Sequence, residues 1–216
     1  MNIILMGPPG AGKGTQSEKI LSYLDIPHIS TGDMFREAIK NQTDLGKLAQ
    51  SYINGGNLVP DEVTIALVKE RLSRDDCKNG YLLDGFPRTI PQAEALEKIA
   101  KEISREVQLV INIDADKEEL VKRISGRRVC PKCGASYHLL FKLPKSEGIC
   151  DSCGNELIQR KDDTIESLNV RLDAYENQTK PLIEFYSKLG LLKEVNGLQD
   201  INDVFKDIQT ILDEVK

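Results

Sequence analysis

A glycine-rich loop follows the apolar segment at the start of this chain. Residues 1–6 are mostly apolar and precede the stretch Gly7-Pro-Pro-Gly-Ala-Gly-Lys-Gly-Thr15. The apolar run ends at glycine and proline, which predicts a short buried strand over residues 2–6. Ile20 and Leu24 lie about one turn apart and predict the inner face of a helix from Lys13 to about Leu24. A strand, a glycine loop and a helix in this order predict a phosphate-binding loop.

The chemistry of phosphate binding accounts for the glycines and the lysine of this loop. Glycines let successive backbone N–H groups surround phosphate oxygens with no side chain in the way, and a lysine bridges the outer phosphates. A glycine-rich turn without a ligand is the alternative, and it requires the lysine and both flanking elements to coincide by chance. The residues that fit this role are Gly7, Gly10, Gly12, Lys13 and Gly14.

The loop departs at one position from the strict pattern G-x-x-x-x-G-K-[ST]. Gly14 follows Lys13, and the hydroxyl comes one residue later, at Thr15. In the strict pattern, the hydroxyl directly after the lysine contacts magnesium. We therefore expect Mg²⁺ to be held by phosphate oxygens and water, with Asp84 as the nearest candidate carboxylate. The alternative is that Asp84 only ends a strand at a turn.

Strand and helix patterns alternate along most of the chain. Apolar runs recur at residues 80–84 and 106–113, with weaker ones near 27–30 and 192–195. Helical patterns lie between them, and three of the helices are expected to follow caps at Asp61, Asp116 and Asp163. Nearly all-apolar strands that alternate with helices predict an α/β protein with a parallel sheet flanked by helices. Ligands of such sheets bind beyond the carboxyl ends of the strands.

Two segments interrupt this alternation. Residues 31–59 contain helical runs at 34–39 and 45–53 and no strong strand. Residues 127–163 contain four cysteines and the run Tyr137-His-Leu-Leu-Phe141, which is typical of a small β unit. Both segments are predicted to be insertions into the sheet domain, the first one helical and the second one a β lid.

Four of the five cysteines form the array C-x2-C-x16-C-x2-C. This spacing is typical of a zinc site with four thiolate ligands, and a glycine after each pair favours the tight turn of such a site. Four protein ligands leave no open coordination position, so the zinc is expected to be structural. Two disulfides are the alternative, and they are disfavoured in a reducing cytosol. The predicted ligands are Cys130, Cys133, Cys150 and Cys153, whereas Cys77 is expected to have no role.

The chain has a net charge of −5, with 29 Lys and Arg residues against 34 Asp and Glu residues. This charge opposes bulk attraction to nucleic acid or to an anionic membrane, so a bound anion must meet a local group of cations. Phosphoryl transfer uses such groups, because positioned cations stabilise the charge on the transferring oxygens. Surface ion pairing is the alternative for each arginine. The candidates are Arg36, Arg88, Arg123, Arg127, Arg160 and Arg171.

The apolar start of the chain is too short for a secretion signal, and no stretch approaches the ~18 apolar residues that cross a bilayer. Paired cysteines of this kind are typical of metal binding in a reducing compartment. We therefore expect a cytoplasmic protein without a membrane or nucleic-acid partner.

Taken in order, these motifs resemble the adenylate kinase family, in its bacterial form with a long, zinc-carrying lid. The resemblance spans essentially the whole chain, through the glycine loop, Ser30-Thr-Gly-Asp33, Leu58-Val-Pro60, Asp84-Gly-Phe-Pro-Arg88 with Gln92, Gly126-Arg-Arg128, and Arg160 with Asp162-Asp163 and Arg171. It implies a monomeric enzyme for the reversible, Mg²⁺-dependent reaction of ATP and AMP to two ADP. It also implies a P-loop core of residues 1–29, 60–126 and 165–216, an AMP-binding domain of residues 30–59 and a zinc-binding lid of residues 127–164.

The resemblance further implies which residues contact each nucleotide. Gln92 reads the adenine edge of AMP, and Arg36 and Arg88 hold its phosphate. The ATP-binding residues are Gly10, Ala11, Gly12, Lys13, Gly14, Thr15, Arg123, Arg127, Tyr137 and Gln199. The AMP-binding residues are Thr31, Arg36, Ile53, Asn57, Val59, Gly85, Arg88, Gln92, Arg160 and Arg171. The catalytic set is Lys13, Asp84, Arg88, Arg123, Arg127, Arg160 and Arg171.

Two other functions fit many of the same residues. A kinase for another nucleoside monophosphate, such as UMP or GMP, would differ mainly at the positions that contact the base. A nucleotide-gated zinc-ribbon module without turnover belongs to a different class, and it needs no cations around a second phosphate site. His28 and His138 are expected to be structural, because phosphoryl transfer by positioning needs no general base.

Overall fold

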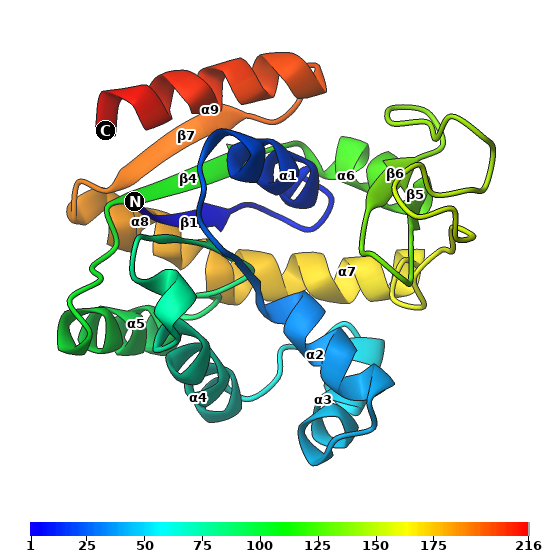
Figure 1. Ribbon diagram of the computed structural model, residues 1–216. Helices are drawn as coiled ribbons and strands as arrows, with labels where there is room; N and C mark the ends of the chain where they lie inside the picture. Colours follow the sequence, from blue (N-terminus) through cyan, green and yellow to red (C-terminus); the bar gives the residue numbers. More distant parts are fainter. Residues whose placement is uncertain (216) are drawn as a thin grey trace.

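The computed structural model describes residues 1–215, and its centre is a sheet of five parallel strands in the order β2-β3-β1-β4-β7 (Figure 1). The strands are β1 (Asn2–Met6), β2 (His28–Ser30), β3 (Tyr81–Asp84), β4 (Leu109–Asp114) and β7 (Leu192–Asn196). β1 lies between β3 and β4, with Ile4 opposite Leu83 and Val110. The predicted α/β fold with a parallel sheet is confirmed.

Successive side chains of a strand point to opposite faces of the sheet. Because both faces of this sheet are apolar, helices cover both of them. Ile3 and Leu5 of β1 lie in one buried core, and Ile4 and Met6 lie in the other. The first core includes side chains of α1 (Lys13–Tyr23), α6 (Lys117–Ser125), α7 (Ile165–Ala174) and α9 (Ile201–Val215). The second includes side chains of α4 (Asp61–Leu72), α5 (Ile90–Glu102) and α8 (Pro181–Lys188). In Figure 1, α9 lies on the opposite side of the sheet from α4 and α5.

The first insertion consists of α2 (Thr31–Lys40) and α3 (Asp44–Asn54), which project from the sheet next to α4 (Figure 1). Both helices have side-chain caps: the Ser30 hydroxyl accepts from the Asp33 N–H at 3.3 Å, and the Thr43 hydroxyl accepts from the Gly46 N–H at 3.1 Å. The helices touch closely at Gly46, where an added Cβ would lie 2.1 Å from the Ala38 carbonyl oxygen.

The second insertion contains the antiparallel pair β5 (Arg127–Val129) and β6 (Ser136–His138). It lies beside α6 and the start of α7 and carries long connecting loops (Figure 1). Of the predicted β run Tyr137–Phe141, only Tyr137 and His138 belong to a strand, β6. The chain turns after His138 because its Nδ1 accepts from the N–H groups of Leu140 and Phe141, at 3.0 and 3.2 Å.

None of the three predicted aspartate caps forms a side-chain cap, although Asp116 does occupy the position directly before α6. The residue that precedes α4 is Pro60, and Asp61 instead accepts hydrogen bonds from the side chains of Thr89 and Gln92, at 2.9 and 2.7 Å. The cap of α7 is Thr164, whose hydroxyl accepts from the Ser167 N–H at 3.2 Å. Asp163 is buried and pairs with a distant arginine, as described below.

Three further features complete the described chain. A short 3-10 helix, Asp75–Cys77, precedes β3, and a π-helical turn, Tyr175–Thr179, joins α7 to α8. Pro181 begins α8 as predicted. Within residues 1–215, every helix is too short or too polar to traverse a lipid bilayer.

Candidate active site

A cavity of about 1120 Å³ opens at the carboxyl edge of the parallel sheet. Its wall includes the loop between β1 and α1, the residues after β3, one face of α7 and parts of both insertions. This is the place where open α/β sheets bind their ligands. The two insertions therefore close over the site that the sheet creates.

The glycine loop forms one wall of this cavity. Gly10 and Gly12 have φ angles of 91° and 98°, which residues with a side chain rarely adopt. A Cβ added at Gly12 or Gly14 would meet no neighbouring atom within 4 Å, so the backbone here borders open space. Helix α1 begins at Lys13, directly after the loop, and its unpaired N–H groups and dipole favour an anion at this end.

The side chain of Lys13 folds back over the loop. Its Nζ donates hydrogen bonds to the carbonyl oxygens of Gly7 and Pro8, at 2.7 and 2.9 Å. Burial lowers the pKa of Lys13 to about 8; the charge of Asp84 opposes this shift and that of Arg88 adds to it. The ammonium group is hydrogen-bonded to two carbonyl oxygens and to no carboxylate of residues 1–215, with Asp84 as an acidic neighbour.

Asp84 ends β3 and faces the cavity near Lys13. Its Oδ2 lies 3.6 Å from Nε2 of His28. Burial alone raises the pKa of Asp84, but the neighbouring His28 and the charge of Lys13 outweigh it and lower the pKa below its usual value. An ionised carboxylate at this position suits a hydrated Mg²⁺ ion.

All six candidate arginines line the cavity, although they come from distant parts of the chain. The wall carries eight Lys and Arg side chains against six carboxylates, whereas the chain as a whole has a net charge of −5. A cleft with this local excess attracts anions. The cationic residues of the wall are Lys13, Arg36, Arg88, Arg123, Arg127, Lys142, Arg160 and Arg171.

Carboxylates behind the wall orient two of these arginines. Arg127 makes a two-fold ion pair with the buried Asp163, in which Nε donates to Oδ2 at 2.9 Å and Nη2 donates to Oδ1. Arg171 lies 3.3 Å from Asp162 and 3.7 Å from Asp163. Such pairs fix the planes of the guanidinium groups and leave other N–H groups free to face a ligand.

Positive charge is most crowded around Arg160 and Arg171. Burial lowers the pKa of each to about 10, and the charge of Arg127 contributes to both shifts. Arg160 also lies 3.9 Å from Asp33, which accepts a 2.6 Å hydrogen bond from Arg36. This crowding indicates a site for a multiply charged anion, because such an anion relieves the repulsion.

The residues predicted to bind ATP all line this cavity, and so do all residues of the predicted catalytic set. Tyr137 reaches the wall from β6 in the lid, and Gln199 reaches it from the segment between β7 and α9. The structure therefore brings together residues that are far apart in the sequence.

The residues predicted to bind AMP fall into two groups. Those in the cavity wall are Arg36, Gly85, Arg88, Arg160 and Arg171, and those outside it are Thr31, Ile53, Asn57, Val59 and Gln92. The Thr31 hydroxyl donates to the Gly85 carbonyl oxygen at 2.8 Å. The Gln92 amide oxygen accepts from the Arg88 N–H at 2.8 Å, and its nitrogen donates to Asp61. Thr31 and Gln92 thus support the wall from behind, and their contact with a nucleotide stays a prediction.

Phe141 and Gly197 were not predicted from the sequence, yet both line the cavity. The Phe141 ring lies 6.0 Å from Cζ of Arg123 and 4.5 Å from the His138 ring. Arg123 also donates to the Gly197 carbonyl oxygen at 2.8 Å. Phe141 is 50% exposed, and an exposed aromatic ring in a cavity wall offers a surface on which a base stacks. The sequence feature that could have indicated Phe141 is an aromatic residue within the predicted lid.

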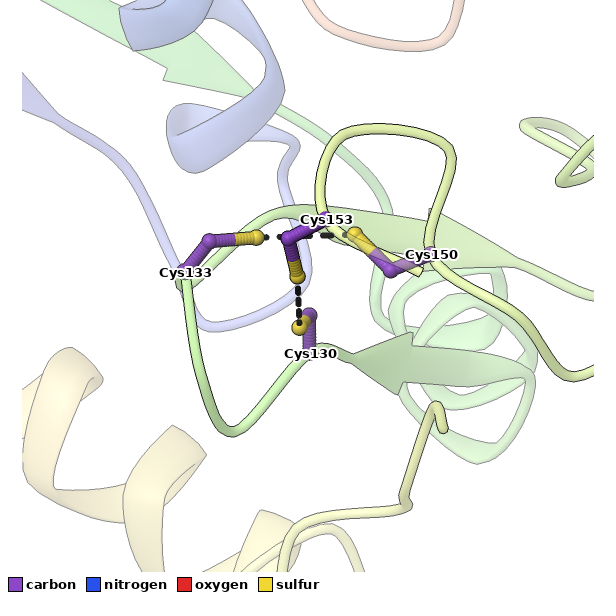
Figure 2. Close-up of side chains that lie close together, drawn as sticks. All are labelled: Cys130, Cys133, Cys150 and Cys153. Carbon is purple, nitrogen blue, oxygen red and sulfur yellow. Dashed lines mark hydrogen bonds between the residues drawn. The ribbon is translucent and has the colours of Figure 1, made fainter. Parts of the chain in front are cut away.

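The four predicted metal ligands converge at the end of β5, where their sulfur atoms point toward one another (Figure 2). All four sulfurs lie within 4.8 Å of one another, with Cys130 and Cys153 at 3.4 Å and Cys133 and Cys150 at 3.5 Å. All four are free thiols.

The backbone around the two cysteine pairs repeats the same turn. Gly134 N–H donates to the Cys130 carbonyl oxygen and Gly154 N–H donates to the Cys150 carbonyl oxygen, each at 2.9 Å. Both glycines have positive φ angles, 78° and 70°. A tetrahedral ion with bonds of ~2.3 Å to sulfur places the sulfurs ~3.8 Å apart, so the cluster fits a four-thiolate metal site.

Comparison with known proteins agrees with this geometry. The family model described as "Adenylate kinase" matches residues 5–191. The chain belongs to the adenylate kinase family. Adenylate kinase of Brevibacillus brevis is 58% identical over 212 residues, which cover 98% of this chain and 99% of the relative. Adenylate kinase of Bacillus subtilis is 57% identical over 216 residues and the full length of both chains. The resemblance read from the motifs is confirmed, and the four-cysteine lid is consistent with the zinc-carrying form of the family.

Proposed function

We propose that this chain catalyses reversible transfer of the γ-phosphoryl group of ATP to AMP, which yields two ADP and balances the adenine nucleotides. The cavity with a local excess of positive charge carries this proposal, because its cations come from the core and from both insertions. Full-length relatives named as adenylate kinases support the choice of nucleotides.

ATP occupies the part of the cavity between the glycine loop and the lid. The backbone of residues 10–15 and the Lys13 ammonium bind its phosphates, because the loop borders open space and the ammonium donates to carbonyl oxygens alone. The adenine lies near Gln199, and the exposed Phe141 ring gives it a stacking surface.

AMP occupies the part of the cavity next to the helical insertion. Arg36 and Arg88 bind its phosphate, and Arg88 is held for this contact by its 2.9 Å hydrogen bond from Nε to the Gly85 carbonyl oxygen. The nucleoside is bound by Thr31, Ile53, Asn57, Val59, Gly85 and Gln92. The buried amide of Gln92 reads the adenine edge.

Positioned cations carry the reaction. Arg123, Arg127, Arg160 and Arg171 neutralise the charge on the transferring group, and the acidic partners behind them keep their planes fixed. No general base is needed, so His28 acts only as a neighbour of Asp84. Closure of the lid excludes water, which would otherwise compete with AMP for the phosphoryl group.

The two metals have separate tasks in this proposal. Asp84 would hold Mg²⁺ through water, and the ion would neutralise the phosphates of ATP. Zinc fills the four-thiolate site, which has no open coordination position, and so stabilises the lid without taking part in the reaction.

The chain divides into three units according to this proposal. The core is formed by residues 1–29, 60–126 and 165–216, the AMP-binding domain by residues 30–59 and the lid by residues 127–164. One chain contributes every residue named above, so the enzyme works as a monomer. The net charge of −5 and the reduced cysteines favour a cytoplasmic enzyme without nucleic-acid or membrane partners.

A coupled assay with ATP and each of AMP, UMP and GMP tests this function. We expect kcat/KM for AMP to exceed that for the other acceptors by roughly 100-fold, because a buried amide that pairs with one base rejects others. Preference for UMP or GMP would make the chain a kinase for that nucleotide. Binding of ATP without turnover of any acceptor would make it a nucleotide-gated module.

A further inference from the structure

A second cavity of about 370 Å³ lies on the other side of the phosphate loop. Pro8 lines this second cavity, whereas its neighbours Gly7 and Pro9 line the first one. The second cavity also borders the carboxyl ends of β4 and β7 and the π-helical turn that begins at Tyr175. Tyr175 lines both cavities, and the other residues of the second wall do not line the first one, where ATP and AMP are proposed to bind.

Asn112 lines the second cavity and is only 1% exposed. Neither its amide nitrogen nor its amide oxygen has a hydrogen-bond partner among residues 1–215. A buried amide without partners is costly, and folded proteins normally satisfy such groups with protein, water or ligand atoms. The unpaired amide oxygen of Asn112 therefore offers an acceptor to a polar occupant of this cavity.

Two carboxylates lie on the same face of the sheet as Asn112. Asp114 follows it by two residues on β4, and Glu194 is its direct neighbour on β7. Side chains two apart on a strand, or paired in register on parallel strands, share a face. Asn112, Asp114 and Glu194 therefore form one group of acceptors at the end of the sheet.

The rest of the wall combines negative charge with apolar surface. Asp173 and Glu176 bring the number of carboxylates in the whole wall to four, against two lysines, and one lysine, Lys180, is already paired with Glu176 at 2.7 Å. Burial, followed by the charges of Asp114, Glu176 and Glu194, raises the pKa of Tyr175 to about 12. The apolar part of the wall is formed by Pro8, Ala115, Leu120, Leu172 and Ile183.

We propose that this second cavity binds a small alkyl-ammonium cation, such as an α,ω-diamine. The ammonium groups donate to the amide oxygen of Asn112 and to the carboxylates of Asp114 and Glu194, and the alkyl chain lies against the apolar wall. A directly coordinated metal ion suits the site less well. In the described part of the chain, the four cysteines form the one group of three or more potential ligands with atoms close enough to share an ion.

Isothermal titration calorimetry of the full-length protein with 1,4-diaminobutane tests this proposal. Saturable binding in the millimolar range is expected, whereas the neutral molecule 1,4-butanediol of the same length shows none. The variant Asn112→Leu removes the amide at similar volume and should bind the diamine roughly fivefold more weakly. Glu194→Gln removes a charge at the rim and should weaken binding roughly threefold.

Two controls keep the test decisive. Glu184→Gln removes an exposed carboxylate on α8 that pairs with Lys188 outside this cavity, and it should leave diamine affinity unchanged. The melting temperature of Asn112→Leu should equal or exceed that of the wild type, because the substitution removes an unpaired buried amide. Absence of saturable binding, equal binding of the diol, or wild-type affinity in both cavity variants would overturn the proposal. Binding of MgCl₂ alone with the same dependence on the variants would make this a divalent-cation site instead.

Discussion

The two insertions close over the same cavity, but different forces hold them together. The lid has only a small buried cluster, formed by Cys130, Tyr137 and Cys150, so its four-thiolate site takes the place of a core. The helical insertion has an apolar cluster around Phe35, Ala49 and Val59 and contains no metal-ligand group. A segment of about forty residues is too small for a core of its own. We therefore expect the lid to depend on a metal, whereas the helical insertion packs against α4.

Loss of one metal ligand should have the largest effect on stability. Cys150→Ala leaves three thiolates, and we expect the melting temperature to fall by about 10 °C, because the lid loses the binding energy of its metal. Turnover at low temperature should fall much less. The exposed neighbour variant Ser152→Ala should match the wild type, and treatment with a chelator should lower the melting temperature of the wild type but not of Cys150→Ala. Equal losses of stability and low-temperature turnover would contradict a structural metal.

A packing change in the helical insertion should have the next largest effect. The Cβ of Gly46→Ala would lie 2.1 Å from the Ala38 carbonyl oxygen, so α2 and α3 must separate, at a cost of about 2 kcal/mol. KM for AMP should rise while KM for ATP changes little, and the loss of stability should be unaffected by a chelator. Gln50→Ala is the control, because Gln50 is an exposed residue of α3 outside the cavity wall. Equal changes in both KM values would show that the insertions are not independent.

The two nucleotide sites should also differ in their pH dependence. The pKa of Lys13 is lowered to about 8, so the free enzyme loses this charge as the pH rises through 8, and kcat/KM for ATP should fall about tenfold per pH unit above it. Arg160 and Arg171 keep their charge to about pH 10, so kcat/KM for AMP should stay level up to about pH 9. In Lys13→Arg, the fall in kcat/KM for ATP should begin at a higher pH, because arginine keeps its charge to higher pH than lysine. A level profile for ATP would contradict the lowered pKa of Lys13 in the free enzyme.

The smallest effect is expected from the contact between the lid and the core. Lys142 of the lid lies 2.5 Å from Glu18 of α1. An ion pair at the surface contributes about 0.5 kcal/mol, so Lys142→Gln should raise KM for ATP roughly twofold and leave KM for AMP unchanged. Lys145→Gln, in the same lid, is the control. An identical rise in both variants would show that lid charge in general, and not this contact, sets the effect.

The sequence predicted those features that depend on residues close together in the chain. The loop from Gly7 to Thr15 carries its own signal, since the glycines, the lysine and the flanking strand and helix are contiguous. The pairing of the cysteines into two similar turns follows from the spacing within each pair and from Gly134 and Gly154. The alternation of apolar runs and helical patterns likewise predicted the parallel sheet.

Features that depend on distant partners could not be predicted. Asp163 has the right spacing for a helix cap, but Arg127, 36 residues away, draws it into a buried ion pair, and Thr164 takes over the cap. Gln92 matches the family motif, but its hydrogen bonds to Arg88 and Asp61 emerge only from the fold. The π-helical turn Tyr175–Thr179 has no local sequence signal that distinguishes it from an α-helix.

The central claim is that fixed cations around one cavity carry phosphoryl transfer, and Lys13 tests it most directly. Steady-state rates with ATP and AMP should be compared for Lys13→Met and for Lys19→Met, whose lysine lies on the same helix outside the cavity and donates to Asn202. The account predicts that Lys13→Met lowers kcat/KM by at least ~1000-fold with an unchanged melting temperature, and that Lys19→Met stays within about twofold of the wild type. A Lys13→Met variant with wild-type velocity would contradict the account.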